Sequence, residues 1–190
     1  MKDAILYKML RPLITGVYKL FFTPKFIGTE NIPASGRVVL AGNHTSNFDA
    51  PLLISATKRN VHFLAKKELW DGPKKIIFAN MGLIPVDRKN KDGNALIMAE
   101  RYLKNEKLVG IFPEGTTEKT GEMLKFKKGA VKMAMDTDSP IVPFVITGKY
   151  KLFSKDLTIK FLKPIKCNGD IKEETERLMN IIKKERENLR

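Results

Sequence analysis

The sequence predicts a single α/β domain with a mostly parallel central sheet flanked by helices, preceded by N-terminal amphipathic helices. Three observations predict it: the length of the chain, the alternation of short apolar runs with amphipathic segments, and a wide apolar arc near the N-terminus. With 190 residues, 43% of them hydrophobic, the chain can form one substantial core but not two independent domains. We therefore divide it only into an amphipathic segment, residues 1–24, and an α/β domain, residues 25–190.

The N-terminal segment has the periodicity of an amphipathic helix. Lys8, Arg11, Thr15 and Lys19 recur at helical spacing and leave a wide apolar arc between them. Pro12 removes a backbone donor, so two short helices are as plausible as one long helix. The arc ends in aromatic residues and nearly all its charges are cationic, which favours a membrane-associating segment on an anionic lipid surface. Packing of the arc against the domain is the alternative.

Beyond Pro24, short apolar runs alternate with amphipathic stretches, which is the pattern of an α/β sheet. The tail pairs Glu173 with Arg177 at i,i+4 and places apolar residues on one face, so it closes the chain as a helix. The expected strands are 38–40, 61–65, 83–86, 108–112, 141–146 and 157–162, and the expected helices are 94–107, 126–135 and 171–190.

The charge balance predicts an anionic partner. Lysine and arginine outnumber aspartate and glutamate by 35 to 21, a formal net charge of +14. Charge alone does not choose among nucleic acid, an acidic lipid surface, a phosphorylated small molecule and an acidic carrier protein. Cys167 is the only cysteine, so we expect no internal disulfide and a reducing, cytosolic side. We expect neither a secretory signal nor a spanning helix, since no apolar run approaches about eighteen residues.

The most informative stretch is GNHTSNFD at residues 42–49, which follows the predicted strand 38–40, where α/β folds expose catalytic groups. It contains a histidine and a carboxylate, His44 and Asp49, with four residues between them. A carboxylate on one nitrogen of an imidazole fixes the tautomer and makes the other nitrogen more basic. Because positions five apart lie about 140° around a helix, the pair can meet only if this segment begins as a turn.

Two neighbouring candidates are interpreted as structural. His62, the only other histidine, lies in an apolar run beside Val61 and Phe63, with no acidic partner nearby. Ser46 is two residues from His44 and poorly placed to share a triad with it, so we expect a capping or hydrogen-bonding role. Taken alone, His44 is also compatible with a loop or capping role.

Four blocks, in order, resemble the lysophospholipid and glycerol-phosphate acyltransferase family. NHTSNFD at 43–49 resembles its Asn-His-x-Ser-x-x-Asp signature. GLIPVDR at 82–88, FPEGT at 112–116 and VPF at 142–144 resemble its second, third and fourth blocks. The resemblance covers residues 43–144, and four blocks in the same order leave little room for coincidence.

The resemblance implies transfer of a fatty acyl group from a thioester, acyl-coenzyme A or acyl-acyl carrier protein, to the free hydroxyl of lysophosphatidic acid, which gives phosphatidic acid. His44 would be the general base and Asp49 would orient its imidazole. We expect no covalent acyl enzyme, no cofactor and no metal ion. The alternative acceptors are glycerol 3-phosphate or another lysophospholipid, since each offers a hydroxyl near a phosphate.

The phosphate of the acceptor needs fixed cations. Arg88 ends the second block with a planar fork, and the resemblance implies that it binds phosphate. Lys66 resembles a second phosphate contact, with Lys67 as an adjacent rival and a solvated surface charge as the alternative for either lysine.

The third block is expected to position the acceptor or its loop. Glu114 either hydrogen-bonds the glycerol hydroxyl of the acceptor, as the resemblance implies, or braces the loop with Thr116, and Gly115 allows close approach of backbone to substrate. The donors to the oxyanion are left open, with Gly115 as the first place to look. The family usually has an arginine where this chain has Thr117. Three lysines could restore that charge, although solvated surface positions are the alternative: Lys125, Lys127 and Lys128.

The expected partners are an anionic membrane surface, lysophosphatidic acid and an acyl thioester donor, at the cytoplasmic face of a membrane in peripheral or monotopic association. Nucleic acid is not expected, because aromatic and basic residues do not interleave as in single-strand binders. A noncatalytic basic module would leave the ordered blocks unexplained. A metal-dependent hydrolase built on both histidines lacks any recognisable metal signature.

Overall fold

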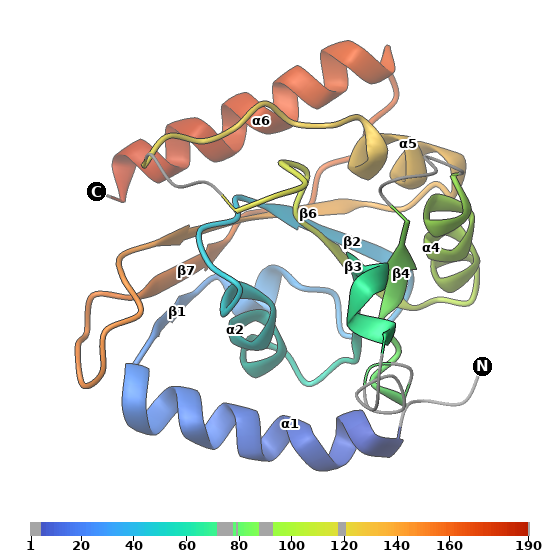
Figure 1. The fold of residues 1–190 in the computed structure, drawn as a ribbon. Coiled ribbons are helices and arrows are strands. Elements are labelled where there is room, and N and C mark those ends of the chain that lie inside the picture. Colours follow the sequence, from blue (N-terminus) through green and yellow to red (C-terminus); the bar gives the residue numbers. More distant parts are fainter. Residues whose placement is uncertain (1–4, 72–77, 79, 88–92, 118–120, 190) are drawn as a thin grey trace.

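The computed structural model describes residues 5–71, 78, 80–87, 93–117 and 121–189 (Figure 1). Its centre is a seven-stranded sheet with the order β1-β7-β6-β2-β5-β3-β4. Every neighbouring pair is parallel except β6 and β7. The strands are β1 (Lys25–Ile27), β2 (Val38–Gly42), β3 (Val61–Lys66), β4 (Ile84–Val86), β5 (Leu108–Ile111), β6 (Ile141–Thr147) and β7 (Thr158–Phe161). This architecture confirms the predicted α/β class.

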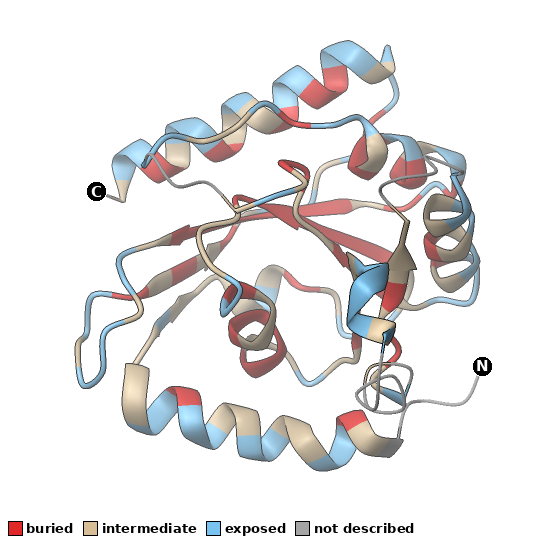
Figure 2. Cartoon of the chain, viewed as in Figure 1, coloured by how far each residue is buried: buried red, intermediate tan, exposed pale blue. Residues whose placement is uncertain are grey.

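Helices cover both faces of the sheet (Figure 1). The helices α1 (Ile5–Val17) and α2 (Asp49–Ala56) lie on one face, and α4 (Asn94–Lys104), α5 (Gly129–Asp136) and α6 (Ile171–Asn188) lie on the other. Figure 2 shows buried residues concentrated in the strands and on the inward sides of the helices. Two apolar cores result, one on each face of the sheet.

The register of the strands brings the functional blocks to one edge of the sheet. Leu40 of β2 pairs with Gly110 of β5 and with Val142 of β6, and Gly110 also pairs with Phe63 of β3. Since these strands are parallel, the segments that leave their carboxyl ends meet at the same edge. The helix after β2 lies on the opposite face from the helix after β5 (Figure 1). Adjacent strands whose connections diverge in this way mark the usual ligand position in open α/β sheets.

Among the strands and α-helices of the described residues, two were not predicted. β1 has three residues, too few for a detectable pattern, and pairs with β7 at the edge of the sheet. α2 is mostly buried, so it lacks the amphipathic periodicity by which helices are recognised. Pro51 falls in its first turn, where a missing backbone donor is tolerated. Each predicted strand and helix is present, with ends shifted by a few residues.

The N-terminal segment forms one helix with Pro12 inside it, continued by a π-helical turn at Tyr18–Phe22. Tyr7 and Tyr18 are buried against the domain. Arg11 also faces inward, where its Nε donates to the carbonyl of Thr57 at 2.7 Å. The outer side is apolar instead, with four exposed residues at helical spacing, which we call the outer stripe: Met9, Leu13, Val17 and Leu20. Among the described residues, no helix combines the length and apolar character needed to cross a bilayer.

Candidate active site

The loop that carries His44 is held to the sheet by the residues before it. The side-chain amide of Asn43 pairs with the backbone of Ile146 in β6, donating to its carbonyl at 2.9 Å and accepting from its N–H at 2.8 Å. Gly42 lies against Phe144 so closely that a Cβ would come within 2.3 Å of the ring. The start of the block therefore fixes where the chain leaves β2.

The predicted meeting of His44 and Asp49 is present. Nδ1 of His44 lies 2.8 Å from Oδ2 of Asp49. The pair meets because residues 43–46 are irregular, the chain turns at residues 47–48, and Asp49 begins α2, as the spacing requires. With Nδ1–H donating to the carboxylate, Nε2 is the nitrogen that can accept a proton. The His44 side chain is 16% exposed, whereas Asp49 is fully buried.

Several groups besides His44 donate to the buried carboxylate of Asp49. The backbone N–H groups of Thr45 and Ser46 donate to Oδ2 at 2.6 and 2.9 Å. The hydroxyls of Thr45 and Tyr150 donate to Oδ1 at 3.1 and 2.5 Å. Burial and the negative charge of Asp49 raise the pKa of Tyr150, so its hydroxyl remains a donor. This dense set of donors compensates a buried charge and prevents rotation of the carboxylate.

Aromatic rings surround the pair. His44 stacks on Phe112 with ring centroids 4.0 Å apart, and Phe112 meets the ring of Phe144 edge-on. On the other side, Tyr150 contacts Phe48 and Phe22. The block at 142–144 is buried in β6, so it contributes to the site by packing behind Phe112.

Glu114 braces the loop of His44. Its Oε1 accepts from the backbone N–H of His44 at 2.8 Å, and its Oε2 accepts from the N–H of Leu124 at 2.8 Å. The residue is 4% exposed, and burial raises the pKa of its carboxyl despite these hydrogen bonds. Of the two roles expected for Glu114, these contacts are those of the brace.

The turn at Gly115 brings one of the three candidate lysines to the site. Gly115 has a φ of +75°, and a Cβ placed there would lie 2.6 Å from Nζ of Lys127. The Gly115 N–H donates to the carbonyl of Phe112 at 3.0 Å, so this amide is already used within the turn. Thr116 follows as an exposed residue. The ammonium of Lys127 therefore lies beside Gly115 of the third block, two residues before Thr117 in the sequence.

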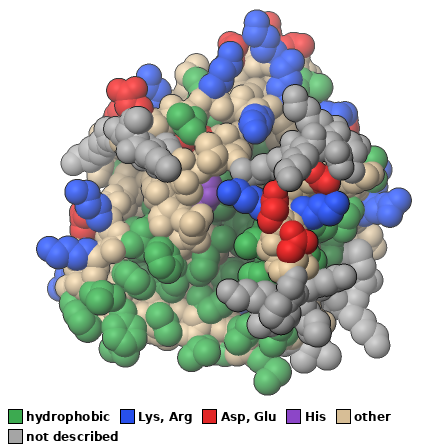
Figure 3. Space-filling view, viewed as in Figure 1, with side chains coloured by type: hydrophobic (Ala, Val, Ile, Leu, Met, Phe, Trp, Pro, Cys, Tyr) green, Lys and Arg blue, Asp and Glu red, His purple; other side chains and the backbone are tan. Residues whose placement is uncertain are grey.

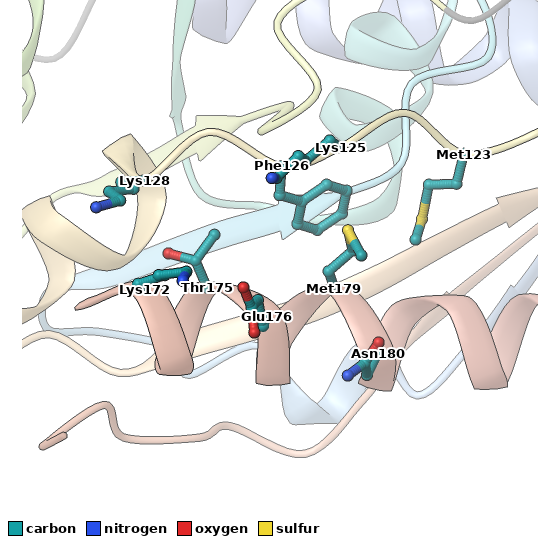
Figure 4. A pocket seen from close by; sticks show the side chains of 9 residues that line it. All are labelled: Met123, Lys125, Phe126, Lys128, Lys172, Thr175, Glu176, Met179 and Asn180. Carbon is teal, nitrogen blue, oxygen red and sulfur yellow. The ribbon is translucent and has the colours of Figure 1, made fainter. Parts of the chain in front are cut away.

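The other two lysines lie elsewhere. Lys125 and Lys128 line a groove of about 670 Å³ between residues 123–128 and α6 (Figure 4). Its floor is apolar, where the side chains of Phe126 and Met179 face each other. The described residues that line it include neither His44 nor Asp49.

Of the two predicted phosphate ligands, the structure describes Lys66 but not Arg88. Lys66 is the last residue of β3 and is exposed at the same edge of the sheet as the His44 loop. Its rival Lys67 forms an ion pair with Asp87, Nζ to Oδ2 at 3.0 Å. Arg88 lies outside the described residues, two positions after the end of β4.

His62 lies apart from the pair formed by His44 and Asp49. Its Nδ1 is 2.8 Å from the carbonyl of Gly82, and its ring packs on Tyr102. Within the described part of the chain, no three His, Cys, Asp or Glu side chains are grouped to hold a metal ion.

Two contributors to the site are not evident from the sequence. Tyr150 is 101 residues from Asp49, and nothing in the pattern around it suggests a contact with that carboxylate. Asn43 belongs to the first block, but its pairing with β6 depends on strand order, which local sequence does not reveal. The only available signal for Asn43 was its position directly before His44.

A solvent-reaching histidine oriented by a fully buried carboxylate, at the carboxyl edge of a parallel sheet, defines an α/β protein equipped for general-base catalysis. The chain belongs to the acyltransferase family, since the model described as Acyltransferase matches residues 23–147. This match confirms the resemblance seen in the four ordered blocks.

Named relatives and a solved structure agree with this family. The chain is similar to the 1-acyl-sn-glycerol-3-phosphate acyltransferases of Bacillus subtilis, 31% identical over 75% of this chain and 72% of that protein, and of Borreliella burgdorferi, 33% identical over 68% and 53%. It spans about half the length of several such relatives. The crystal structure of the 1-acyl-sn-glycerophosphate acyltransferase PlsC of Thermotoga maritima matches with a TM-score of 0.77 and 26% identity, over 97% of this chain and 82% of that one.

Proposed function

We propose that this protein transfers a fatty acyl group from acyl-coenzyme A or acyl-acyl carrier protein to the free hydroxyl of lysophosphatidic acid. The observation that carries the proposal is the 2.8 Å contact between Nδ1 of His44 and Oδ2 of Asp49, which leaves Nε2 as the base. The names of the relatives supply the acceptor, since both bacterial relatives are 1-acyl-sn-glycerol-3-phosphate acyltransferases.

The proposed transfer is direct. Nε2 of His44 takes the proton of the acceptor hydroxyl while its oxygen attacks the thioester carbonyl, and Asp49 stabilises the imidazolium that forms. Collapse of the tetrahedral intermediate breaks the carbon–sulfur bond, and the thiolate takes the proton from Nε2. The products are phosphatidic acid and the free thiol of the donor, with no covalent acyl enzyme, metal ion or redox cofactor.

Cations would hold the phosphate of the acceptor while its hydroxyl faces His44. We assign this role to Arg88 and Lys66, and the position of Lys127 beside Gly115 supports it as a third contact. Glu114 acts on the reaction by fixing the backbone of His44.

The outer stripe of α1 supports association with an anionic membrane. Four exposed apolar side chains on one side of a helix, in a protein with a net charge of +14, are suited to a lipid interface that is apolar inside and anionic at its surface. We propose peripheral or monotopic association at the cytoplasmic face, where both lysophosphatidic acid and an acyl thioester are within reach. The net charge suits either donor, because coenzyme A carries phosphates and acyl carrier protein is acidic.

The residue at position 117 favours an alternative acceptor. Thr117 replaces an arginine that is usual in the family, which alters the cation set around the phosphate. Glycerol 3-phosphate or another lysophospholipid is therefore the alternative substrate within the same chemistry.

The test is a thiol-release assay with purified protein, comparing lysophosphatidic acid, glycerol 3-phosphate and other lysophospholipids as acceptors. His44→Ala should lower turnover by about three orders of magnitude while thermal unfolding and vesicle binding persist. The matched control is His62→Gln, whose amide can still donate to the Gly82 carbonyl and which should retain turnover. Equal activity of parent and His44→Ala would refute the assigned base, and vesicle binding without any acyl transfer would favour a noncatalytic module.

A further inference from the structure

The loop between β6 and β7 exposes two large apolar side chains. Leu152 is 57% exposed and Phe153 is 71% exposed, the highest fraction among the exposed large hydrophobic residues of the described chain. Exposed lysines surround them in the sequence KYKLFSK: Lys149, Lys151 and Lys155. Leucine and phenylalanine between flexible cations match the composition of segments that enter the interface of an anionic bilayer.

The loop is held in place by hydrogen bonds of its own backbone, one of them made at its tip. The N–H of Lys149 donates to the carboxylate of Asp156 at 3.0 Å. The N–H of Phe153 donates to the carbonyl of Phe21 at 2.6 Å, and the hydroxyl of Thr23 donates to the carbonyl of Ser154 at 2.7 Å. The backbone of the apolar tip is therefore ordered, while its side chains remain exposed.

Phe153 has a backbone conformation that is unfavourable for its residue type. Its φ is +56°, in the left-handed region that bulky side chains seldom adopt. Such a conformation is strained and persists only where the surroundings impose it. Here it holds an exposed aromatic ring outward, beside the ring of Phe21 at a centroid distance of 5.8 Å.

The tip continues the outer stripe of α1. The contacts of Phe21 and Thr23 join the end of the N-terminal helix to the loop, and Figure 1 shows the loop beside that end of α1. In the space-filling view, hydrophobic side chains gather over α1 and on the side where the loop lies (Figure 3). The two elements therefore expose apolar side chains on neighbouring parts of the surface.

We propose that residues 149–155 form a second membrane-contact element, in which Leu152 and Phe153 enter an anionic bilayer together with the outer stripe. The inference rests on the membrane association proposed for α1 and adds a contact that α1 alone does not provide. Tyr150, at the base of the same loop, donates to Asp49. The membrane-contacting tip would therefore be only two residues along the chain from Tyr150, which contacts Asp49. This places the lipid surface near the proposed catalytic pair, which the hydroxyl of a lysophospholipid must reach.

The test measures binding to phosphatidylcholine vesicles with and without phosphatidylglycerol by co-sedimentation. The double variant Leu152→Ser, Phe153→Ser should bind the anionic vesicles at least about tenfold more weakly than the parent. The matched control is Ile97→Ser on α4, an exposed apolar residue on the other face of the sheet, which should bind like the parent. Activity toward a short-chain, monomeric lysophosphatidic acid should remain close to that of the parent.

A second measurement tests the loop contact even if the double variant does not fold. Leu152→Trp in a Trp70→Phe background provides a single tryptophan at the tip, and its emission should shift to the blue and be quenched by brominated lipid when vesicles are added. Parent-like binding of the double variant, or an unshifted and unquenched tryptophan, would overturn the loop contact. Unchanged vesicle binding with selective loss of activity on acyl-acyl carrier protein would instead assign the loop to the donor.

Failure of the membrane association and failure of the loop contact would give different results. Leu13→Ser with Leu20→Ser tests the outer stripe alone, without removing the buried tyrosines of α1. If the parent does not bind vesicles, the membrane association itself is wrong. If the stripe variant weakens binding and the loop variant does not, only the loop contact is wrong.

Discussion

The hydroxyl of Tyr150 donates a 2.5 Å hydrogen bond to Oδ1 of Asp49, whose other carboxylate oxygen contacts Nδ1 of His44. The tyrosine thus holds the carboxylate that orients the proposed base. It reaches this position from the segment after β6, and its ring packs against Tyr18, Phe22 and Phe48.

Tyr150→Phe should therefore lower kcat by about tenfold and leave KM for the acceptor nearly unchanged. The reason is that the ring packing survives while one charge-assisted hydrogen bond, worth roughly 1.5 kcal/mol or more, is removed from Asp49. Steady-state kinetics on the parent and the variant give the split, and the low-field proton resonance of the contact between His44 and Asp49 should move. Tyr102→Phe is the control, since Tyr102 packs on His62. A purely structural role would lower thermal stability without changing kcat or that resonance.

Lys127 should contribute to acceptor binding, whereas Lys125 and Lys128 should not. Lys127→Met removes the ammonium that lies beside Gly115, so KM for a phosphate-bearing acceptor should rise about tenfold with a smaller change in kcat. Lys125→Met and Lys128→Met remove the same charge from the groove beside α6 and serve as matched controls. Equal effects of all three substitutions would indicate a general field and not a phosphate contact.

Gly115→Ala tests whether the turn at Gly115 positions Lys127, without removing the lysine. Alanine would be strained at a φ of +75°, and its methyl group would meet the Lys127 side chain. We expect the KM for the acceptor to rise at least as much as in Lys127→Met. A variant with parent-like kinetics would show that the turn does not position this lysine.

Glu114 should make stability depend on pH in a defined direction. Its carboxyl has a pKa raised above the ordinary 4.5 by burial, so the folded protein holds this proton to higher pH than the unfolded chain does. Protonation of Glu114 therefore favours the folded state. As the pH rises above about 4.5, the free energy of unfolding falls by up to about 1.4 kcal/mol per pH unit, until the pKa of Glu114 in the folded protein is passed.

The comparison is between the parent and Glu114→Gln in urea unfolding over a range of pH. Relative to the glutamine variant, the parent should lose free energy of unfolding as the pH rises from 4.5. Glu176→Gln, at an exposed position on α6, is the control for the substitution itself. Parallel profiles for Glu114→Gln and the parent would contradict the raised pKa.

Cys167 should react slowly with thiol reagents in the folded protein. Burial, followed by the charge of Glu174, raises the pKa of its thiol from 9.0 to about 11, which lowers the thiolate fraction near pH 8 by about a hundredfold. Iodoacetamide labelling followed by mass spectrometry measures the rate. The urea-unfolded chain should react like free cysteine, and a native rate equal to that of free cysteine would show that the thiol is accessible. The slow reaction also keeps this thiol from contributing to a thiol-release assay.

Local patterns predicted most of the fold. The apolar runs that became β2, β3, β5 and β6 are buried on both sides, so their strand character is visible without knowledge of their neighbours. β1 and α2 were missed for the opposite reason, because a three-residue edge strand and a helix buried almost all round carry no periodic signal.

The sequence by itself determined that His44 and Asp49 can meet: they are close along the chain, and their meeting needs only a turn before a helix. The tertiary structure alone decided which distant groups lie around the site. Tyr150 reaches Asp49, and Lys127, unlike Lys125 and Lys128, lies beside Gly115, because strand order and loop packing bring these residues together. It also decided that Arg11 faces the domain while the outer stripe faces away, because rotation of a helix about its axis is set by what it packs against.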